Sequence, residues 1–343
     1  MIHDLATRVL HAFDPEEAHR LSILGLKAGL GPRQLRSDDS VLATELAGLP
    51  ISNPLGLAAG YDKNAEVPDA LLAMGFGFVE LGAVTPRGQA GKPKPRIFRL
   101  SEDEAVINRM GFPNEGLDLF AQRLRARKER GGIVGVNLGA NLDSEDRVAD
   151  YVTCLEALKD DAQFFTVNIS SPNTPGLRDM QSKETLIELI SRVVAVRGKA
   201  PLFLKIAPDI ADEEIADIID VVTTHKMDGV IVSNTTLARP ETLQSANAAE
   251  MGGLSGPPVF ARSTELVRAF RNAAGPGLTI IGVGGVRDAD TAYAKIRAGA
   301  NAIQIYTALV YEGPGLIGRI KSGLAERLYS DGFASVAEAV GAE

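Results

Sequence analysis

Several features that point to common classes of protein are missing from this sequence. The 343 residues include one cysteine, Cys154, so neither an intrachain disulfide nor a cluster of thiolate metal ligands is possible, and a reducing, intracellular location is expected. No apolar run of about eighteen or more residues occurs, so no segment is expected to span a membrane. Charged residues from Asp4 to Glu17 interrupt any apolar core near the amino terminus, which argues against a signal peptide.

Two further classes are excluded by charge and by missing motifs. The formal net charge is -8, whereas a general nucleic-acid binder needs a basic surface to displace the counterions of phosphate. No Gly-x-Gly-x-x-Gly pattern follows a first strand, so a nicotinamide-binding doubly wound domain is not expected. The four histidines lie outside the segments that follow the predicted strands, so neither a histidine base nor a histidine metal site is expected there.

The regular feature of the chain is an alternation of short apolar runs with segments of helical spacing, which begins near residue 53. Several runs are continuous rather than alternating, as is typical of parallel strands buried on both faces. The eight runs are 54–59, 77–82, 133–138, 164–169, 202–206, 229–233, 278–283 and 302–306. Eight alternations over roughly 250–290 residues favour an α/β protein with a (β/α)8 TIM barrel, and the structural alternative is an open doubly wound sheet.

Three segments interrupt or precede this alternation. Residues 85–116 predict a loop with a small hairpin over the barrel, and 237–255 predict a long polar loop that is a candidate lid. Residues 1–35 predict a helical hairpin, in which Asp14 caps the second helix and Pro15 occupies its first position. This hairpin either packs on the barrel or forms a small apolar platform for a membrane surface. The domains are therefore 1–35 for the hairpin and 36–343 for the barrel.

Polar side chains gather where the predicted strands end. The richest segment is 168–176, which is full of amides and hydroxyls, although such residues also favour an ordinary turn. Asn137, Asn168 and Asn234 each lie at or near a strand end, which suggests a ring of amides around a planar ligand. The last two strands end in glycines 284–285 and in residues 306–307, where barrels of this type bind phosphate.

A lysine in the middle of an apolar strand is the other unusual feature. Lys205 follows Phe203 and Leu204, and its burial is costly unless it meets an anion or an acceptor, such as the N1/O2 edge of a reduced flavin. The alternative is a lysine whose head group reaches solvent at the strand edge. Lys63, which follows the first strand, is a second candidate ligand-binding lysine.

These motifs resemble those of the class 2, quinone-dependent dihydroorotate dehydrogenases. The resemblance extends from residue 14 to about 330 and is carried, in family order, by segments 53–60, 85–87, 94–96, 108–112, 168–176, 205–209, 234–236, 252–256 and 282–285. It implies an enzyme that oxidises (S)-dihydroorotate to orotate and passes the electrons through FMN to a membrane quinone, in de novo pyrimidine biosynthesis.

The resemblance also implies roles for individual residues. Ser171 matches the catalytic base, for which class 1 relatives use a cysteine that Cys154 lies too early in the chain to replace. FMN would be held by Ala59, Gly60, Lys63, Ala83, Asn137, Asn168, Lys205, Ser233, Gly256, Gly285, Tyr306 and Thr307. Dihydroorotate would be held by Lys63, Asn108, Arg109, Met110, Gly111, Phe112, Asn168, Asn173, Asn234 and Thr235. Many relatives have threonine in place of Ala83 and Ser233, so one hydroxyl contact is expected to be lost at Ala83.

The remaining implications concern partners. The quinone would meet His19 and Arg99, the protein would attach peripherally to the cytoplasmic face of the cell membrane as a monomer, and no metal is expected. Thr174 is the candidate for a proton relay outward from Ser171. The alternatives are another FMN barrel, such as a class 1 or dihydropyrimidine-type oxidoreductase, and a flavin- or phosphate-binding barrel with a regulatory role.

Overall fold

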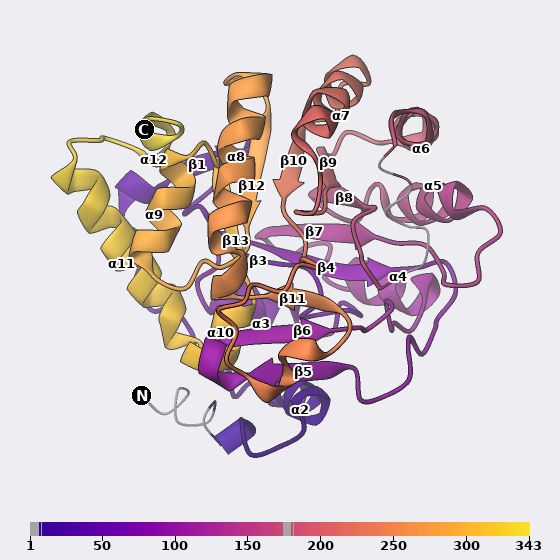
Figure 1. Ribbon diagram of the computed structural model, residues 1–343, viewed down its shortest axis with the longest axis horizontal. Coiled ribbons are helices and arrows are strands. Elements are labelled where there is room, and N and C mark those ends of the chain that lie inside the picture. Colours follow the sequence, from indigo (N-terminus) through magenta and orange to yellow (C-terminus); the bar gives the residue numbers. More distant parts are fainter. Residues whose placement is uncertain (1–6, 8, 174–179, 181) are drawn as a thin grey trace.

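A closed barrel of eight parallel strands forms the centre of the computed structural model, which describes residues 7, 9–173, 180 and 182–343 (Figure 1). The barrel strands are β3 (Leu55–Leu57), β4 (Phe78–Val84), β7 (Ile133–Leu138), β8 (Phe164–Asn168), β9 (Leu202–Lys205), β10 (Gly229–Val232), β12 (Thr279–Val283) and β13 (Ala302–Ile305). Each overlaps one of the predicted apolar runs, so the predicted (β/α)8 barrel is confirmed.

Helices surround the barrel because each buries one apolar face against it (Figure 1). They are α3 (Pro68–Ala73), α4 (Leu117–Arg125), α5 (Arg147–Leu158), α6 (Lys183–Val196), α7 (Asp212–Thr224), α8 (Phe260–Ala274), α9 (Ala289–Arg297) and α11 (Gly315–Ser330), with short α10 (Thr307–Glu312) and α12 (Val336–Ala339). In α7 the buried residues include Ile215, Ile218 and Val222, the spacing expected from the sequence. Every residue of β4 is buried, as expected for a strand covered on both faces.

Aromatic rings fill the end of the barrel at which its strands begin. Phe164 packs edge-to-face on Phe78 at 6.0 Å and on Phe203 at 5.7 Å between ring centroids. A Cβ at Gly135 would lie 2.0 Å from the Phe164 ring, so only glycine leaves room for it. A hairpin of β1 (Thr44–Leu46) and β2 (Leu49–Ile51), which the sequence did not predict, contributes apolar residues to the same cluster.

The two insertions combine into one small sheet. The hairpin predicted within 85–116 is β5 (Ile97–Leu100) and β6 (Ala105–Asn108), and β11 (Gly253–Ser255) adds a third antiparallel strand to β6 (Figure 1). β11 is the end of the segment predicted to be a polar lid, so this segment is partly sheet. The Arg239 guanidinium holds the rest of it by donating to the carbonyls of Ala248, Glu250 and Gly252 at 2.7–3.1 Å.

Short 3-10 turns complete the fold. They are η1 (Ser40–Leu42), η2 (Ser101–Asp103), η4 (Ala246–Ala249) and η5 (Pro257–Val259). η2 lies between β5 and β6, and the Asp103 carboxylate there accepts hydrogen bonds from the backbone of Gln244 at 2.9 Å and Ser245 at 3.1 Å. The loop before η4 is thereby tied to the turn of the upper hairpin.

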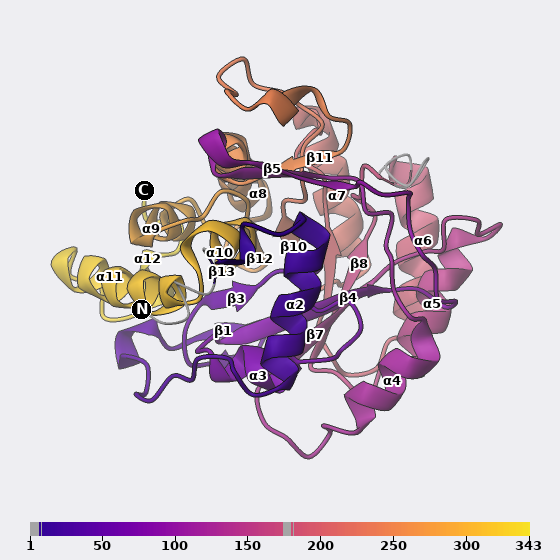
Figure 2. The ribbon, with the colours of Figure 1, turned by 90° about the horizontal axis from the view of Figure 1, so that it is seen from below.

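The N-terminal segment lies against the barrel beside α3 and β5 (Figure 2). Its main helix is α2 (Pro15–Lys27), and Asp14 Oδ1 accepts from the backbone N–H groups of Glu16 and Glu17 at 2.9 and 3.2 Å, which confirms the predicted cap. Residues 7 and 9–10 are also helical. Among the described residues, no helix is long and apolar enough to cross a membrane. A domain boundary at residue 35 stays a prediction.

Candidate active site

A cavity of about 1170 Å³ opens at the carboxyl ends of the barrel strands and continues beneath the N-terminal hairpin. Strand ends, the small upper sheet and α2 all contribute to its wall. A pocket for one small ligand is roughly 300–1,000 Å³, so this cavity has room for more than one. With the exception of Arg109, every residue that the sequence assigned to flavin, substrate, base or quinone lines it.

The predicted ring of asparagines is a continuous hydrogen-bonded chain. Asn137 Nδ2 donates to Glu80 Oε1 at 2.6 Å, and Asn168 Nδ2 donates to Asn137 Oδ1 at 2.9 Å. Asn234 Nδ2 lies 3.4 Å from Asn168 Oδ1 and 3.0 Å from Ser170 Oγ. Three strand ends, those of β7, β8 and β10, are thus joined through their side chains.

The groups at the two ends of this hydrogen-bonded chain impose the same donor-to-acceptor direction on every amide in it. Glu80 is fully buried, and its carboxylate can only accept. At the other end the backbone N–H of Thr235 donates to Asn234 Oδ1 at 2.8 Å, and a backbone N–H can only donate. Asn137 and Asn168 therefore each keep one amide N–H beyond the chain. The arrangement presents hydrogen-bond donors to a ligand in the cavity.

Two polar residues inside the barrel were missed by the sequence reasoning. Gln304 Nε2 donates to Glu80 Oε2 at 2.7 Å, so Glu80 joins β13 to β4 and β7. Gln304 Oε1 is buried without a hydrogen-bond partner, and within the described residues Lys205 Nζ likewise has none. Gln304 and Lys205 both line the cavity. A ligand with both donor and acceptor atoms, such as a flavin ring, fits this set. The signal that found Lys205, a polar residue inside an apolar strand, applies equally to Glu80.

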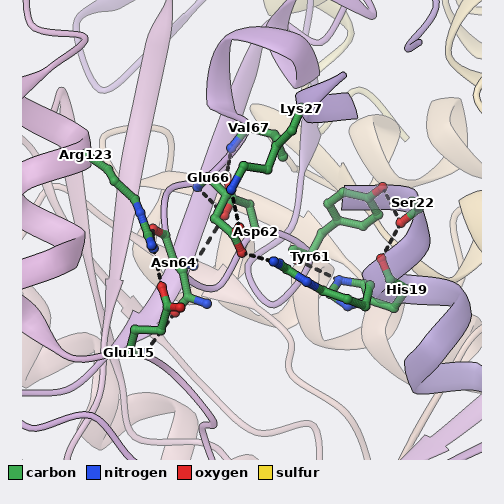
Figure 3. Close-up of polar contacts among 11 residues, drawn as sticks. His19, Ser22, Lys27, Tyr61, Asp62, Asn64, Glu66, Val67, Glu115 and Arg123 are labelled. Atoms are coloured by element: carbon green, nitrogen blue, oxygen red, sulfur yellow. Dashed lines mark hydrogen bonds and ion pairs between the residues drawn. The ribbon is translucent and has the colours of Figure 1, made fainter. Parts of the chain in front are cut away.

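The loop after β3 carries Lys63 into the cavity. The side chain of Asp62 holds this loop from within (Figure 3). The Asp62 carboxylate accepts from the backbone of Glu66 and Val67, both at 2.8 Å. Burial raises the pKa of Asp62. Lys63 Nζ donates to the carbonyl of Gly60, and burial lowers the pKa of Lys63 to about 8. Lys63 is therefore a cation that loses its charge in mildly basic solution.

Helix α2 holds the same loop from outside (Figure 3). Glu66 forms ion pairs with Arg20 at 2.7 Å and with Lys27 at 2.8 Å. His19 Nε2 lies 2.8 Å from the carbonyl of Tyr61, which can only accept, so Nε2 carries the proton. Burial lowers the pKa of His19 to about 3, and the ring is neutral. Its Nδ1 is therefore an acceptor, so His19 does reach the barrel mouth, through α2 rather than through a strand-end loop.

Two arginines from the upper hairpin tie down the N-terminal segment. Arg96 makes a bidentate pair with the Glu16 carboxylate at 2.6 and 3.0 Å, and its side chain is almost completely buried. Arg99, which lines the cavity, donates to the carbonyls of His11 (2.7 Å) and Phe13. Arg99, which was predicted to contact the quinone, thus also holds the N-terminal residues His11 and Phe13 against β5.

At the predicted phosphate end of the cavity, packing within the protein requires two glycines. A Cβ at Gly285 would lie 2.5 Å from Phe260 Cβ, at a backbone φ of +72°, so the glycine is needed for packing against α8. Gly256 is similar: its φ is +103°, and a Cβ would lie 2.9 Å from the carbonyl oxygen of Glu104. Thr307 Oγ1 donates to Ser255 Oγ at 2.9 Å, which links this end to β11.

Ser171 lies in the wall of the cavity with almost no exposed surface. Its Oγ accepts from the Asn173 backbone at 3.3 Å, and the Asn173 amide donates to Asn108 Oδ1 of β6 at 3.3 Å. No other described residue hydrogen-bonds to Ser171 Oγ. Thr174, the predicted relay, lies outside the described residues. Cys154 is buried on α5 outside the cavity lining, and burial raises the pKa of its thiol, so it is no substitute base.

Arg109 is the predicted substrate residue that the fold does not bring to the cavity. Its guanidinium donates to Glu250 Oε2 at 2.7 Å and to the Met251 carbonyl at 3.0 Å. It also lies 4.4 Å from the centroid of the Phe98 ring. The side chain therefore joins the upper hairpin to the loop before β11.

In sequence, the chain is similar to known proteins of one family. The family model for dihydroorotate dehydrogenase matches residues 41–328. A protein of Parvibaculum lavamentivorans named dihydroorotate dehydrogenase (quinone) is 54% identical over 340 residues, covering 99% of this chain and 98% of its own length. A Brucella ovis protein of the same name is 53% identical over 346 residues, covering 98% and 95%.

Solved structures show the same likeness. The crystal structure of Eimeria tenella dihydroorotate dehydrogenase in complex with ferulenol matches with a TM-score of 0.93 at 39% identity, covering 96% of this chain and 95% of its own. The ligand-free type of that enzyme matches with a TM-score of 0.93 at 40% identity, covering 96% and 99%.

Proposed function

The chain belongs to the dihydroorotate dehydrogenase family, and from that premise we propose how its own residues carry out the reaction. It oxidises dihydroorotate to orotate in pyrimidine biosynthesis and passes the electrons through a flavin to a quinone. One observation carries the assignment of roles: a single cavity is lined by Ser171 and the asparagines at the barrel end and by α2 at the other. Substrate and quinone therefore have separate places around one cofactor.

The flavin is proposed to be FMN. Its phosphate would lie at the end built from Gly285, Tyr306 and Thr307, where barrels of this type bind phosphate. Its ring would meet Lys205 Nζ and Gln304 Oε1, two cavity-lining polar atoms that have no hydrogen-bond partner among the described residues. When bound, the flavin supplies the acceptor for the hydride that leaves C6 of dihydroorotate.

Ser171 is proposed to take the proton from C5 of the substrate. A serine hydroxyl is a poor base unless the developing negative charge is stabilised and its own proton can leave. The free amide N–H of Asn168 and the ammonium of Lys63 supply donors aimed into the cavity. Asn108 and Asn173, which are already hydrogen-bonded to each other, would orient the substrate under the upper sheet.

Apolar side chains form part of the cavity wall at the end where the quinone is proposed to bind. Val9, Leu10, Leu21, Leu26 and Leu30 line the cavity there. His19 was expected to hydrogen-bond a quinone carbonyl, but its Nδ1 can only accept. Arg99, which has five N–H donors, is therefore proposed to meet the quinone carbonyl, and His19 to accept from the hydroxyl of the reduced quinol.

Peripheral attachment to the cytoplasmic face of the cell membrane, as a monomer, is proposed from the outer surface of the N-terminal segment. Five apolar side chains of this segment are between 41 and 69% exposed: Phe13 and Leu24 lie outside the cavity, and Val9, Leu21 and Leu30 also line it. Clustered apolar side chains on a short amphipathic helix are typical of helices that lie in a membrane interface. Such a position would let a quinone pass from lipid into the cavity.

The test is flavin reduction followed by reoxidation with a panel of acceptors. Dihydroorotate should bleach the bound flavin, and a long-chain quinone should restore its colour faster than fumarate or NAD. A flavin that dihydroorotate cannot reduce would contradict the assigned chemistry and leave a binding protein. Preferential reoxidation by fumarate or NAD would contradict the quinone assignment.

A further inference from the structure

Lys295 is a buried lysine outside the cavity that the reaction leaves unexplained. It lies on α9 and has no exposed surface. Its Nζ donates to Ser263 Oγ at 2.6 Å and lies 5.0 Å from the centroid of the Phe260 ring. No carboxylate among the described residues pairs with it, and burial lowers its pKa to about 7. A buried ammonium without an anion is costly, so its retention calls for a physical reason.

The position of Lys295 supplies one. Its aliphatic stem packs on the backbone of β12, where a Cβ at Gly282 would lie 2.7 Å from its Cγ and Cδ. The two groups that meet its ammonium, the Ser263 hydroxyl and the Phe260 ring, both touch the residues that follow β12. Ser263 Oγ lies 3.1 Å from the carbonyl of Gly284, and Phe260 packs on Gly285. The ammonium is therefore separated by one layer of residues from glycines that line the cavity.

We propose that Lys295 is a buried counter-charge for the phosphate group of the cofactor, and that it makes this site select FMN over riboflavin. The inference rests on the proposed cofactor. Lys295 does not line the cavity and so acts as a positioning residue, through the field of its charge across the glycine loop. A water-excluded interior screens such a field weakly. A phosphate dianion would in turn favour the charged form of the lysine.

A purely structural role for Lys295 predicts a different effect on flavin affinity. If Lys295 only held Ser263, and through it Gly284, its loss would loosen the loop and weaken every flavin equally. Two neutral replacements separate these roles. Lys295→Met keeps most of the side-chain volume, and Lys295→Gln also keeps a donor for Ser263. Neither the methionine nor the glutamine at this position would contact the substrate or the base.

The experiment is a titration of flavin-free protein with FMN and with riboflavin, followed by the quenching of flavin fluorescence. Both variants should bind FMN about tenfold or more weaker than the wild type, while their riboflavin affinity stays within about twofold. The flavin-free Lys295→Met protein should melt no lower than the wild type, because a buried charge has been replaced by an apolar chain.

Three outcomes overturn the inference. One is an equal loss of affinity for both flavins, and another is an unchanged FMN affinity in Lys295→Met. The third is recovery of FMN affinity in Lys295→Gln, which would assign the effect to the Ser263 contact. A wild-type protein that binds riboflavin but not FMN contradicts the proposed cofactor itself, and can be told apart because it does not depend on the variants.

Discussion

At the barrel end of the cavity, side-chain amides are joined into a hydrogen-bonded chain, whereas at the hairpin end the wall is apolar and its polar groups bind the protein's own backbone. Asn137, Asn168 and Asn234 are each fixed by their neighbours, from Glu80 outward. His19 and Arg99 instead donate to carbonyls of Tyr61, His11 and Phe13. The first end is built to hold one polar substrate in one orientation, and the second to admit an apolar one. Substrate oxidation and quinone reduction should therefore fail separately.

The largest separation is expected for Ser171→Ala. If Ser171 is the base, flavin reduction by dihydroorotate should slow by roughly 10²–10⁴-fold, because a general base contributes about that much. The reduced flavin should still be reoxidised by quinone at the normal rate. Stopped-flow absorbance measures both half-reactions. Near-normal reduction would remove Ser171 from the mechanism.

Glu80→Gln tests whether the direction of the amide chain matters. The new amide must turn an N–H toward either Asn137 or Gln304, so either one of these amides turns over and loses its direction in the chain, or a buried donor is left facing a donor. We expect flavin reduction to slow by roughly 5- to 100-fold, with a shifted flavin spectrum and normal reoxidation. Thr166→Val is the matched control, because Thr166 is buried in the barrel and its Oγ1 has no hydrogen-bond partner among the residues that the structure describes. Equal effects of the two substitutions would mean that only barrel packing was disturbed.

Lys63 should give the barrel end a pH dependence. Burial lowers its pKa to about 8, so the free enzyme carries the charge below that pH and loses it above. Because dihydroorotate is an anion, kcat/KM for its oxidation should fall as pH rises through about 8, by about tenfold per pH unit at most. Lys63→Met should be slower at neutral pH and lack this decline. A decline that persists in Lys63→Met belongs to another group.

The smallest effect is expected at the outer face of the hairpin. Phe13→Lys and Leu24→Lys place charges on side chains that are 44 and 45% exposed, and each should weaken binding to liposomes severalfold. Flavin reduction should not change. Leu119→Lys on α4, at a residue 43% exposed, is the control. Similar liposome binding by all three variants would return the hairpin to a packing role.

Residues close in sequence could be assigned to their elements before the structure was known. The barrel strands were predicted because continuous apolar runs are a local pattern, and the α2 cap because Asp14 bonds to backbone only two and three residues away. The strand-end asparagines could be placed around one centre because parallel strands of a barrel end on the same face. The resemblance to the family was likewise carried by short segments.

Pairings across the molecule were decided by the tertiary structure alone. β11 has only three residues and becomes a strand because it meets β6, which lies far earlier in the chain. Gln304 and Glu80 become partners only when the barrel closes, since β13 joins β3 and β3 joins β4. Lys295 contacts Ser263 of α8, and through it the loop that contains Gly284, and no local sequence pattern links these segments. Local periodicity determines which face of a strand or helix is buried, but register and closure determine which polar groups then meet.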